Sequence, residues 1–180
     1  MSVFTNPATS TAEETQAYIE AILGLLGQRD PVEVLAATPS ALRRTVSELP
    51  AESLTVPEAE GKWSIRDVLR HLADSEIAWS WRLRLTLSQD RPRLTGWDQD
   101  AWAGTLLYED ADAEEAMVTF DALRRENLRL LRGVPDEALD RVALHEERGE
   151  ESVRFMTKLF GGHDLLHLRQ IERIRAAIRA

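Results

Sequence analysis

Residues 153–178 read VRFMTKLFGGHDLLHLRQIERIRAAI, and this segment gives the clearest indication of the fold. Apolar side chains recur in it at steps of three or four residues, which is the spacing of one face of an α-helix. That face is formed by Val153, Met156, Phe160, His163, His167, Ile171, Ile174 and Ile178. Two histidines therefore occupy positions where a helical bundle normally places Leu or Ile. We expect a final helix over about residues 150–178 whose inner face carries both imidazoles.

Helical periodicity dominates the rest of the chain as well, and no run shows the alternation typical of a β-strand. Helices are predicted over residues 64–88 and 112–132, after an arm that breaks at Asp30-Pro31 into residues 11–28 and 39–49. Residues 91–104 and 143–149 are predicted as loops, and residues 135–139 as a short helical turn. Four long helices with connections of medium length predict an all-α fold, a four-helix bundle, with no sheet beyond a stray pair of residues.

Composition narrows the class of partner. The 180 residues fit a single domain, 1–180, and carry a net charge of −9. Phosphates repel such a chain, so we expect neither nucleic acid nor membrane as a partner. No apolar run approaches the roughly 18 residues of a membrane span, and residues 1–11 lack the apolar core of a signal peptide. These features predict a cytoplasmic protein.

The two central histidines suggest a metal site. The chain has no cysteine, so its metal ligands must be His, Asp or Glu. His163 and His167 lie one helical turn apart, a spacing that suits two ligands of one ion. His71, beside the apolar stripe of residues 64–88, is the best third ligand. Three histidines leave coordination positions open, as catalytic sites do, and nitrogen ligands suit one divalent ion such as Zn, Ni, Fe or Mn.

A less specific interpretation of the pair remains open, because histidines on an apolar helix face are often core residues without a metal. The Glu of the H-E-x-x-H motif is also missing, so the pair does not predict a zincin-type protease.

Other residues near this stripe have two interpretations each. Asp74 and Gln170 follow His71 and His167 by about one turn and could orient the ligands. An exposed helix acid is the favoured interpretation of Asp74, and a hydrogen bond in the core is the alternative for Gln170. Gly161-Gly162 leaves room for a ligand or a close helix, or marks a kink.

Three further features do not belong to the proposed metal ligands. Glu76 interrupts the apolar stripe of its helix, and His145 is predicted to be a solvated loop residue. The loop around Trp97 and Trp102 is where substrate specificity would be sought.

Two runs resemble the signatures of a known family. Residues 61–76, GKWSIRDVLRHLADSE, and residues 163–171, HDLLHLRQI, are similar to the paired motifs of the DinB/YfiT-like superfamily. The resemblance covers most of the chain, with a core of about residues 32–175. It implies a four-helix bundle of the DinB/YfiT-like type, often dimeric, with one divalent metal on His71, His163 and His167.

The resemblance also suggests an activity class. Relatives include metal-dependent hydrolases and S-transferases that use a low-molecular-weight thiol such as bacillithiol, mycothiol or glutathione. We therefore expect a metal-dependent hydrolase or thiol-dependent S-transferase that acts on a small molecule, as a homodimer. The alternative is a non-catalytic, metal-binding stress-response bundle. Neither the substrate nor the catalytic residues beyond the ligands follow from the sequence.

Overall fold

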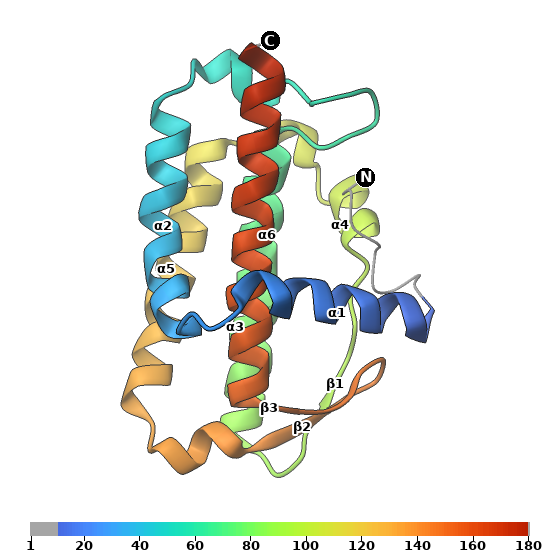
Figure 1. Cartoon of the computed structure of the whole chain (residues 1–180), viewed down its shortest axis with the longest axis vertical. Helices are drawn as coiled ribbons and strands as arrows, with labels where there is room; N and C mark the ends of the chain where they lie inside the picture. The colour runs from blue at the N-terminus through green and yellow to red at the C-terminus, as the bar shows by residue number, and fades with distance from the viewer. Residues whose placement is uncertain (1–10, 180) are drawn as a thin grey trace.

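The computed structural model describes residues 11–179, and four long helices in it run along the longest axis of the molecule (Figure 1). They are α2 (Pro31–Ser47), α3 (Ile65–Ser88), α5 (Ala113–Gly133) and α6 (Val153–Arg179). Helix α3 packs against α5, α5 against α2, α2 against α6 and α6 against α3, so the four helices close into a ring. The predicted all-α four-helix bundle is confirmed.

Helix α1 (Ala12–Leu26) lies across α6 instead of extending the bundle (Figure 1). The helix ends at Gly27, which adopts a positive φ of 58° that glycine accommodates without strain. Helix α2 then begins at Pro31, capped by the side chain of Asp30, and continues through Pro39. The expectation that a new segment starts at Asp30-Pro31 is confirmed, but the boundary of a second piece at residue 39 is wrong, because the helix runs through it. The helix begins at Pro31, because Asp30 is a good N-cap and proline is favoured at the first helical position.

The predicted starts of two helices are confirmed by their caps. Thr11 and Glu14 form a capping box before α1, and Ser64 and Asp67 form one before α3. In each box the N-cap side chain accepts from a backbone amide and the acid accepts from the N-cap amide. The α3 box fixes where that helix starts, and with it the position of His71 two turns later.

A small sheet at one end of the bundle corrects the sequence expectation. Strand β1 (Arg93–Leu94) pairs in parallel with β2 (Val142–His145), which pairs antiparallel with β3 (Gly149–Ser152). The final helix consequently begins at Val153 and not near residue 150. Strands of two to four residues are too short to show a clear alternation. They form because the bundle brings residues 93–94 beside the hairpin.

Short helices fill the connections. Helix α4 (Gln99–Thr105) lies in the segment predicted as a loop, and Asp98 caps it. The 3₁₀ helices are η2 (Ala51–Thr55), η3 (Tyr108–Asp110) and η4 (Asp136–Asp140), and the last confirms the short turn predicted at residues 135–139.

A layer of polar side chains separates two of the three apolar clusters found among the described residues. One apolar cluster includes Ile65, Leu72, Phe120, Ile171 and Ile174, and the other includes Leu35, Trp79, Leu83, Leu131 and Met156. Between them along α3, α5 and α6 lie buried polar residues that belong to neither cluster, among them His71, Glu76, Arg124, Asp164 and His167. The candidate site is part of this layer.

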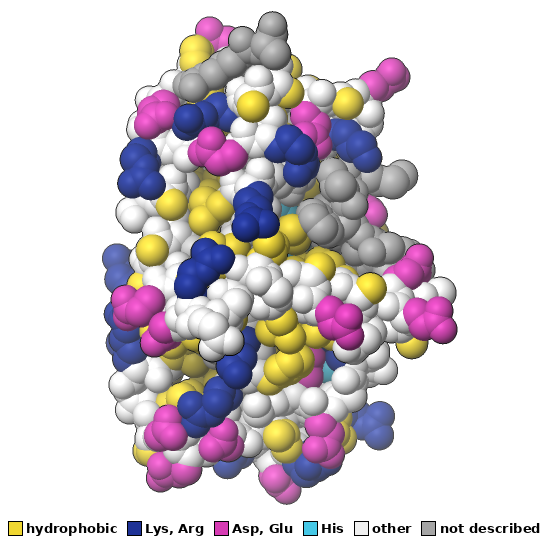
Figure 2. All heavy atoms as spheres, in the orientation of Figure 1, with side chains coloured by type: hydrophobic (Ala, Val, Ile, Leu, Met, Phe, Trp, Pro, Cys, Tyr) yellow, Lys and Arg dark blue, Asp and Glu magenta, His cyan; other side chains and the backbone are white. Residues whose placement is uncertain are grey.

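The surface has no single dominant charge on the face drawn in Figure 2, where Lys and Arg side chains alternate with Asp and Glu. None of the described helices has the combined length and hydropathy needed to cross a bilayer.

Candidate metal centre

Three histidines from two helices meet in the polar layer. His71 comes from α3, and His163 and His167 come from α6. Nε2 of His163 lies 3.2 Å from Nε2 of His71 and 3.1 Å from Nε2 of His167. Within residues 11–179, this trio is the group of His, Asp and Glu side chains whose ligand atoms converge as a metal site requires. The structure thus brings together the three predicted ligands.

The two distances from Nε2 of His163 to the other histidines are those expected for ligands of a single ion. Two nitrogens bound at about 2.0–2.1 Å with tetrahedral angles lie about 3.3–3.4 Å apart, and about 3 Å apart at right angles. The measured 3.1 and 3.2 Å fall between these limits. A network of hydrogen bonds alone satisfies the trio poorly, because a neutral Nε2 holds one proton or one lone pair and His163 faces two partners. The residues therefore fit a divalent ion.

Gln170 fixes the tautomer of one ligand. Its Oε1 lies 2.8 Å from Nδ1 of His167, and both side chains are buried. A carbonyl oxygen only accepts, so Nδ1 of His167 carries the proton and Nε2 presents its lone pair to the other histidines. No hydrogen-bond partner for the buried Nδ1 atoms of His71 and His163 is found among the described residues.

Burial keeps the imidazoles neutral. Desolvation lowers the pKa of His163 to about 4 and, reinforced by His163, that of His167 to about 3. Desolvation also lowers the pKa of His71 well below its ordinary value. Neutral imidazole is the form that binds a metal, so the trio is ready to act as a ligand set at neutral pH.

Asp74 lies elsewhere than either interpretation placed it. Its side chain is buried, not exposed, and it accepts from the hydroxyl of Tyr108 at 2.8 Å and pairs with Arg70. These partners tie α3 to η3. The hydrogen bonds described for Asp74 do not reach a histidine, so Gln170 alone has the expected contact with a ligand.

A buried ion network explains why a glutamate, Glu76, interrupts the apolar stripe of its helix. The same network positions the helix that carries two of the histidines. Arg124 of α5 donates to Glu76 at 2.9 Å and to Asp164 at 2.6 and 3.0 Å, and all three side chains are buried. Asn127 donates to the second oxygen of Glu76 at 2.8 Å. Because Asp164 directly follows His163, the network fixes the α6 backbone relative to α3 and α5. Sequence reasoning singled out Glu76 but missed Arg124, whose position on the inner face of α5 was the available signal.

His145 corrects a second expectation. It is 3% exposed, because the alternation of β2 turns it inward, and its Nδ1 accepts from the amide of Glu147 at 3.3 Å. It is not a solvated loop residue, and it does not join the other three histidines.

The two glycines of α6 are explained by a helix crossing. A Cβ on Gly162 would lie 2.2 Å from the carbonyl oxygen of Ile22 in α1, and one on Gly161 would lie 3.3 Å from Pro31. Helix α6 continues through both residues without a break. The close-helix interpretation therefore holds, and it brings α1 beside the histidines.

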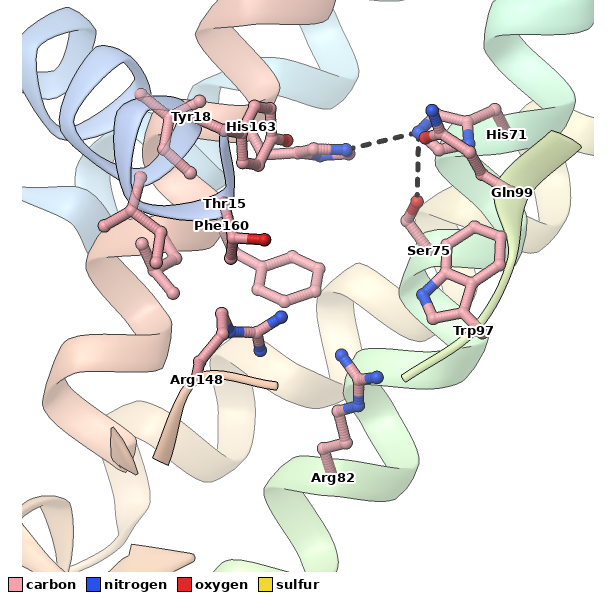
Figure 3. A pocket seen from close by; sticks show the side chains of 13 residues that line it. Thr15, Tyr18, His71, Ser75, Arg82, Trp97, Gln99, Arg148, Phe160 and His163 are labelled. Atoms are coloured by element: carbon pink, nitrogen blue, oxygen red, sulfur yellow. Dashed lines mark hydrogen bonds between the residues drawn. The ribbon is translucent and has the colours of Figure 1, made fainter. Parts of the chain in front are cut away.

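A cavity opens beside two of the histidines (Figure 3). Its accessible volume is about 100 Å³. His71 and His163 lie at one end, Trp97 and Phe160 form walls, and helix α1 contributes Thr15, Tyr18, Ile19 and Ile22. The ring of Trp97 stacks on His71 with centroids 5.7 Å apart, and the ring of Trp102 lies 4.5 Å from Trp97. The tryptophan loop thus covers the site.

The comparison with known families agrees with this geometry. The DinB superfamily profile matches residues 35–171, which span both histidine motifs. The chain belongs to the DinB superfamily. Within this superfamily, similar chains include YfiT of Bacillus subtilis, 25% identical over 146 residues, which cover 79% of this chain and 82% of YfiT.

Two further relatives are similar over comparable or longer stretches. One from Oceanobacillus iheyensis is 29% identical over 133 residues, covering 74% of this chain and 77% of its own. One from Geobacillus kaustophilus is 29% identical over 181 residues, covering 97% and 92%. All three relatives are named as metal-dependent hydrolases.

The solved structure of Bacillus subtilis YfiT has the same fold. It superposes with a TM-score of 0.74 over 93% of this chain and 89% of YfiT, at 22% sequence identity. YfiT is described as having an unusual four-helix bundle topology.

Proposed function

We propose that this protein is a metal-dependent hydrolase that acts on a small molecule. The observation that carries the proposal is the convergence of three Nε2 atoms, two from buried histidines and one from the half-buried His163, beside an open cavity. A structural metal site usually closes all four positions with protein ligands, whereas three ligands leave a position for water or substrate. The names of the similar superfamily members support the same reaction class.

In this proposal His71, His163 and His167 hold one divalent ion, for which Zn, Ni, Fe and Mn are the suitable choices. When bound, such an ion supplies a Lewis acid that lowers the pKa of a coordinating water. The chain supplies the rest. Gln170 holds the His167 tautomer, and the Ser75 hydroxyl, 3.4 Å from Nε2 of His71, offers a hydrogen bond at the edge of the site. Trp97 and Phe160 form the cavity walls and exclude bulk water from its interior.

Two other functions compete with hydrolysis. A thiol-dependent S-transferase would bind a small thiol, since the chain has no cysteine of its own. A non-catalytic bundle would use the metal for stability alone. The cavity beside the histidines favours an enzyme over the non-catalytic bundle, and the names of the relatives favour hydrolysis over thiol transfer.

The deciding experiment is a turnover screen on metal-loaded protein. Aryl esters and anilides test hydrolysis, and glutathione, bacillithiol and mycothiol with a dinitrobenzene electrophile test thiol transfer. Hydrolysis that is lost on metal removal and in His163→Ala supports the proposal. Turnover only with a thiol would assign the transferase, and silence in both arms would favour the non-catalytic bundle.

Two cellular properties belong to the same proposal. We expect the protein in the cytoplasm and, from the family resemblance, as a homodimer. Ile77 and Trp81, one turn apart on α3, are 42% and 64% exposed and offer an apolar surface for a second copy. Light scattering at micromolar concentration should report a dimer for wild type and a monomer for Trp81→Glu.

A further inference from the structure

The charged side chains that line the cavity beside the histidines are both arginines. Two arginines, Arg82 of α3 and Arg148 of the β2–β3 turn, line it, and no carboxylate is found among its described lining residues. Figure 3 shows both guanidinium groups at the end of the cavity opposite His71 and His163. The cavity of an acidic protein with net charge −9 is thus lined by positive charge alone.

Arg82 is a buried cation without an ion-pair partner among residues 11–179. The residue is 8% exposed, and its described hydrogen bond goes to the backbone carbonyl of Thr95 at 2.5 Å. It follows His71 by 11 residues, about three helical turns, so both side chains lie on the same face of α3. Burial, and then the nearby charge of Arg148, lower the pKa of Arg82 to about 10. A buried guanidinium with unused donors is costly unless an anion reaches it.

An ion pair with Glu151 fixes the position of Arg148. Its guanidinium forms a two-point ion pair with Glu151 of β3, at 2.5 and 2.9 Å, and its side chain is 16% exposed. Glu151 is buried and does not line the cavity. The pair therefore orients Arg148 while leaving part of its donor fork available on the cavity side.

The nearby acids do not neutralise Arg82 by contact. Glu146 accepts from the amide of Gly96 at 2.5 Å, and Glu147 packs against the same glycine. These two acids and Glu151 act on Arg82 through longer-range attraction, and no ion pair between Arg82 and an acid is found among residues 11–179. Their contacts fix the turn that carries Arg148 beside the tryptophan loop.

We propose that the cavity binds a small organic anion, with its carboxylate or phosphate on Arg82 and Arg148 and its hydrolysable bond at the three histidines. The apolar walls of Trp97 and Phe160 between the two ends suit a flat apolar spacer. This inference rests on the proposed hydrolase function for the reacting end only. The anion site itself depends on the arginines.

A binding experiment tests the anion site without turnover. Benzoate and phenyl phosphate are titrated calorimetrically into the metal-loaded protein, with benzamide as the uncharged comparison. We expect saturable binding of an anion and none of benzamide. Arg82→Gln and Arg148→Gln should each weaken it about tenfold or more, the scale of a lost charge-assisted hydrogen bond. Arg82→Lys should recover part of the affinity.

Two control variants separate the arginines from other charges. Arg93→Gln removes an exposed arginine of β1, outside the cavity lining, and should leave affinity unchanged. His163→Ala removes a proposed metal ligand and should retain anion binding if the arginines provide it. Circular dichroism of every variant verifies the fold. Equal affinity in folded Arg82→Gln and wild type, or loss only in His163→Ala, would overturn the anion site.

A turnover experiment tests the link between the two ends. The substrates are 4-acetoxybenzoate and its uncharged methyl ester, which share the same acetyl ester bond. We expect kcat/KM for release of the acetyl group to favour the anionic substrate about tenfold or more in wild type, and this preference to disappear in Arg82→Gln but not in Arg93→Gln.

The two proposals fail differently. If neither ester is hydrolysed while arginine-dependent benzoate binding persists, the hydrolase function fails and the anion site stands. If both esters are hydrolysed with metal but without preference for the anion, the anion site fails and the hydrolase stands.

Discussion

Gly162 of α6 lies so close to the carbonyl of Ile22 in α1 that an added Cβ would come within 2.2 Å of that oxygen. The contact sets how closely α1 approaches the bundle. Since Gly162 directly precedes His163, the same contact places Thr15, Tyr18, Ile19 and Ile22 along the cavity beside the proposed metal ligand.

Gly162→Ala should therefore destabilise the protein. Alanine gains roughly 1 kcal/mol of helix propensity over glycine, but overpacking against a backbone carbonyl costs about 1–3 kcal/mol. We expect a net loss of up to about 2 kcal/mol in the free energy of unfolding, measured with urea. Gly24→Ala in α1 is the matched control, because an added Cβ there has no neighbour within 4 Å, and it should be neutral or stabilising. An equal effect of the two substitutions would contradict the close crossing.

Metal content tests the ligand set directly. Purified protein should contain about one divalent ion per chain, and His71→Ala, His163→Ala or His167→Ala should abolish stoichiometric binding, because a three-ligand site cannot spare one member. Elemental analysis after gel filtration measures this. His145→Gln changes the fourth histidine of the chain and should retain the ion. Retained metal in a His163→Ala, His167→Ala double variant would place the site elsewhere.

Gln170 should affect metal affinity without being a ligand. Gln170→Leu removes the acceptor 2.8 Å from Nδ1 of His167 and should weaken metal binding about 10- to 100-fold, as loss of a group that orients a ligand does. Competition with a chelator gives the affinity. Gln170→Glu keeps an acceptor and should restore most of it, whereas an equal loss in both variants would indicate a packing role.

The buried ion network predicts a large effect on stability. Arg124→Met leaves Glu76 and Asp164 without their shared cation and should cost about 3–5 kcal/mol of unfolding free energy. Its neighbour Arg125 is exposed, so Arg125→Met should change stability by about 0.5 kcal/mol or less. Chemical denaturation of both variants gives their free energies of unfolding. Similar values for the two would mean that the ion network contributes little to stability.

His145 should make the fold sensitive to acid. Burial, with help from Arg148 and Arg82, lowers its pKa to about 3, against about 6.5 in an unfolded chain. Below pH 6.5 the unfolded chain binds a proton that the folded protein does not, so stability falls as the pH drops from 6.5 towards 3. We expect His145→Gln to lose about 2 kcal/mol less than wild type between pH 7 and pH 5, measured by urea unfolding. Parallel losses would mean that His145 titrates normally in the fold.

Much of the architecture followed from local pattern. The stripe of residues 153–178 and the caps at Thr11 and Ser64 predicted long helices because periodicity and capping are properties of a few consecutive residues. The same stripe singled out His163 and His167, since polar residues on an apolar face require a reason. The choice of His71 needed the further assumption that its helix lies beside the last one, which the packing of α3 against α6 provides.

Other features depend on contacts between segments far apart in sequence. The strands at Arg93 and Val142 exist because the bundle brings them together, and strand pairing turns His145 inward. Arg124 finds Glu76 and Asp164 only when three helices pack, and Arg82 meets Arg148 only when the hairpin closes over α3. The helices and the residues with metal-binding chemistry could be predicted from the chain alone, because these are short-range properties. Which charges are buried, which are paired and what lines the cavity could be known only from the packed fold, because electrostatic energies depend on distance and burial in space.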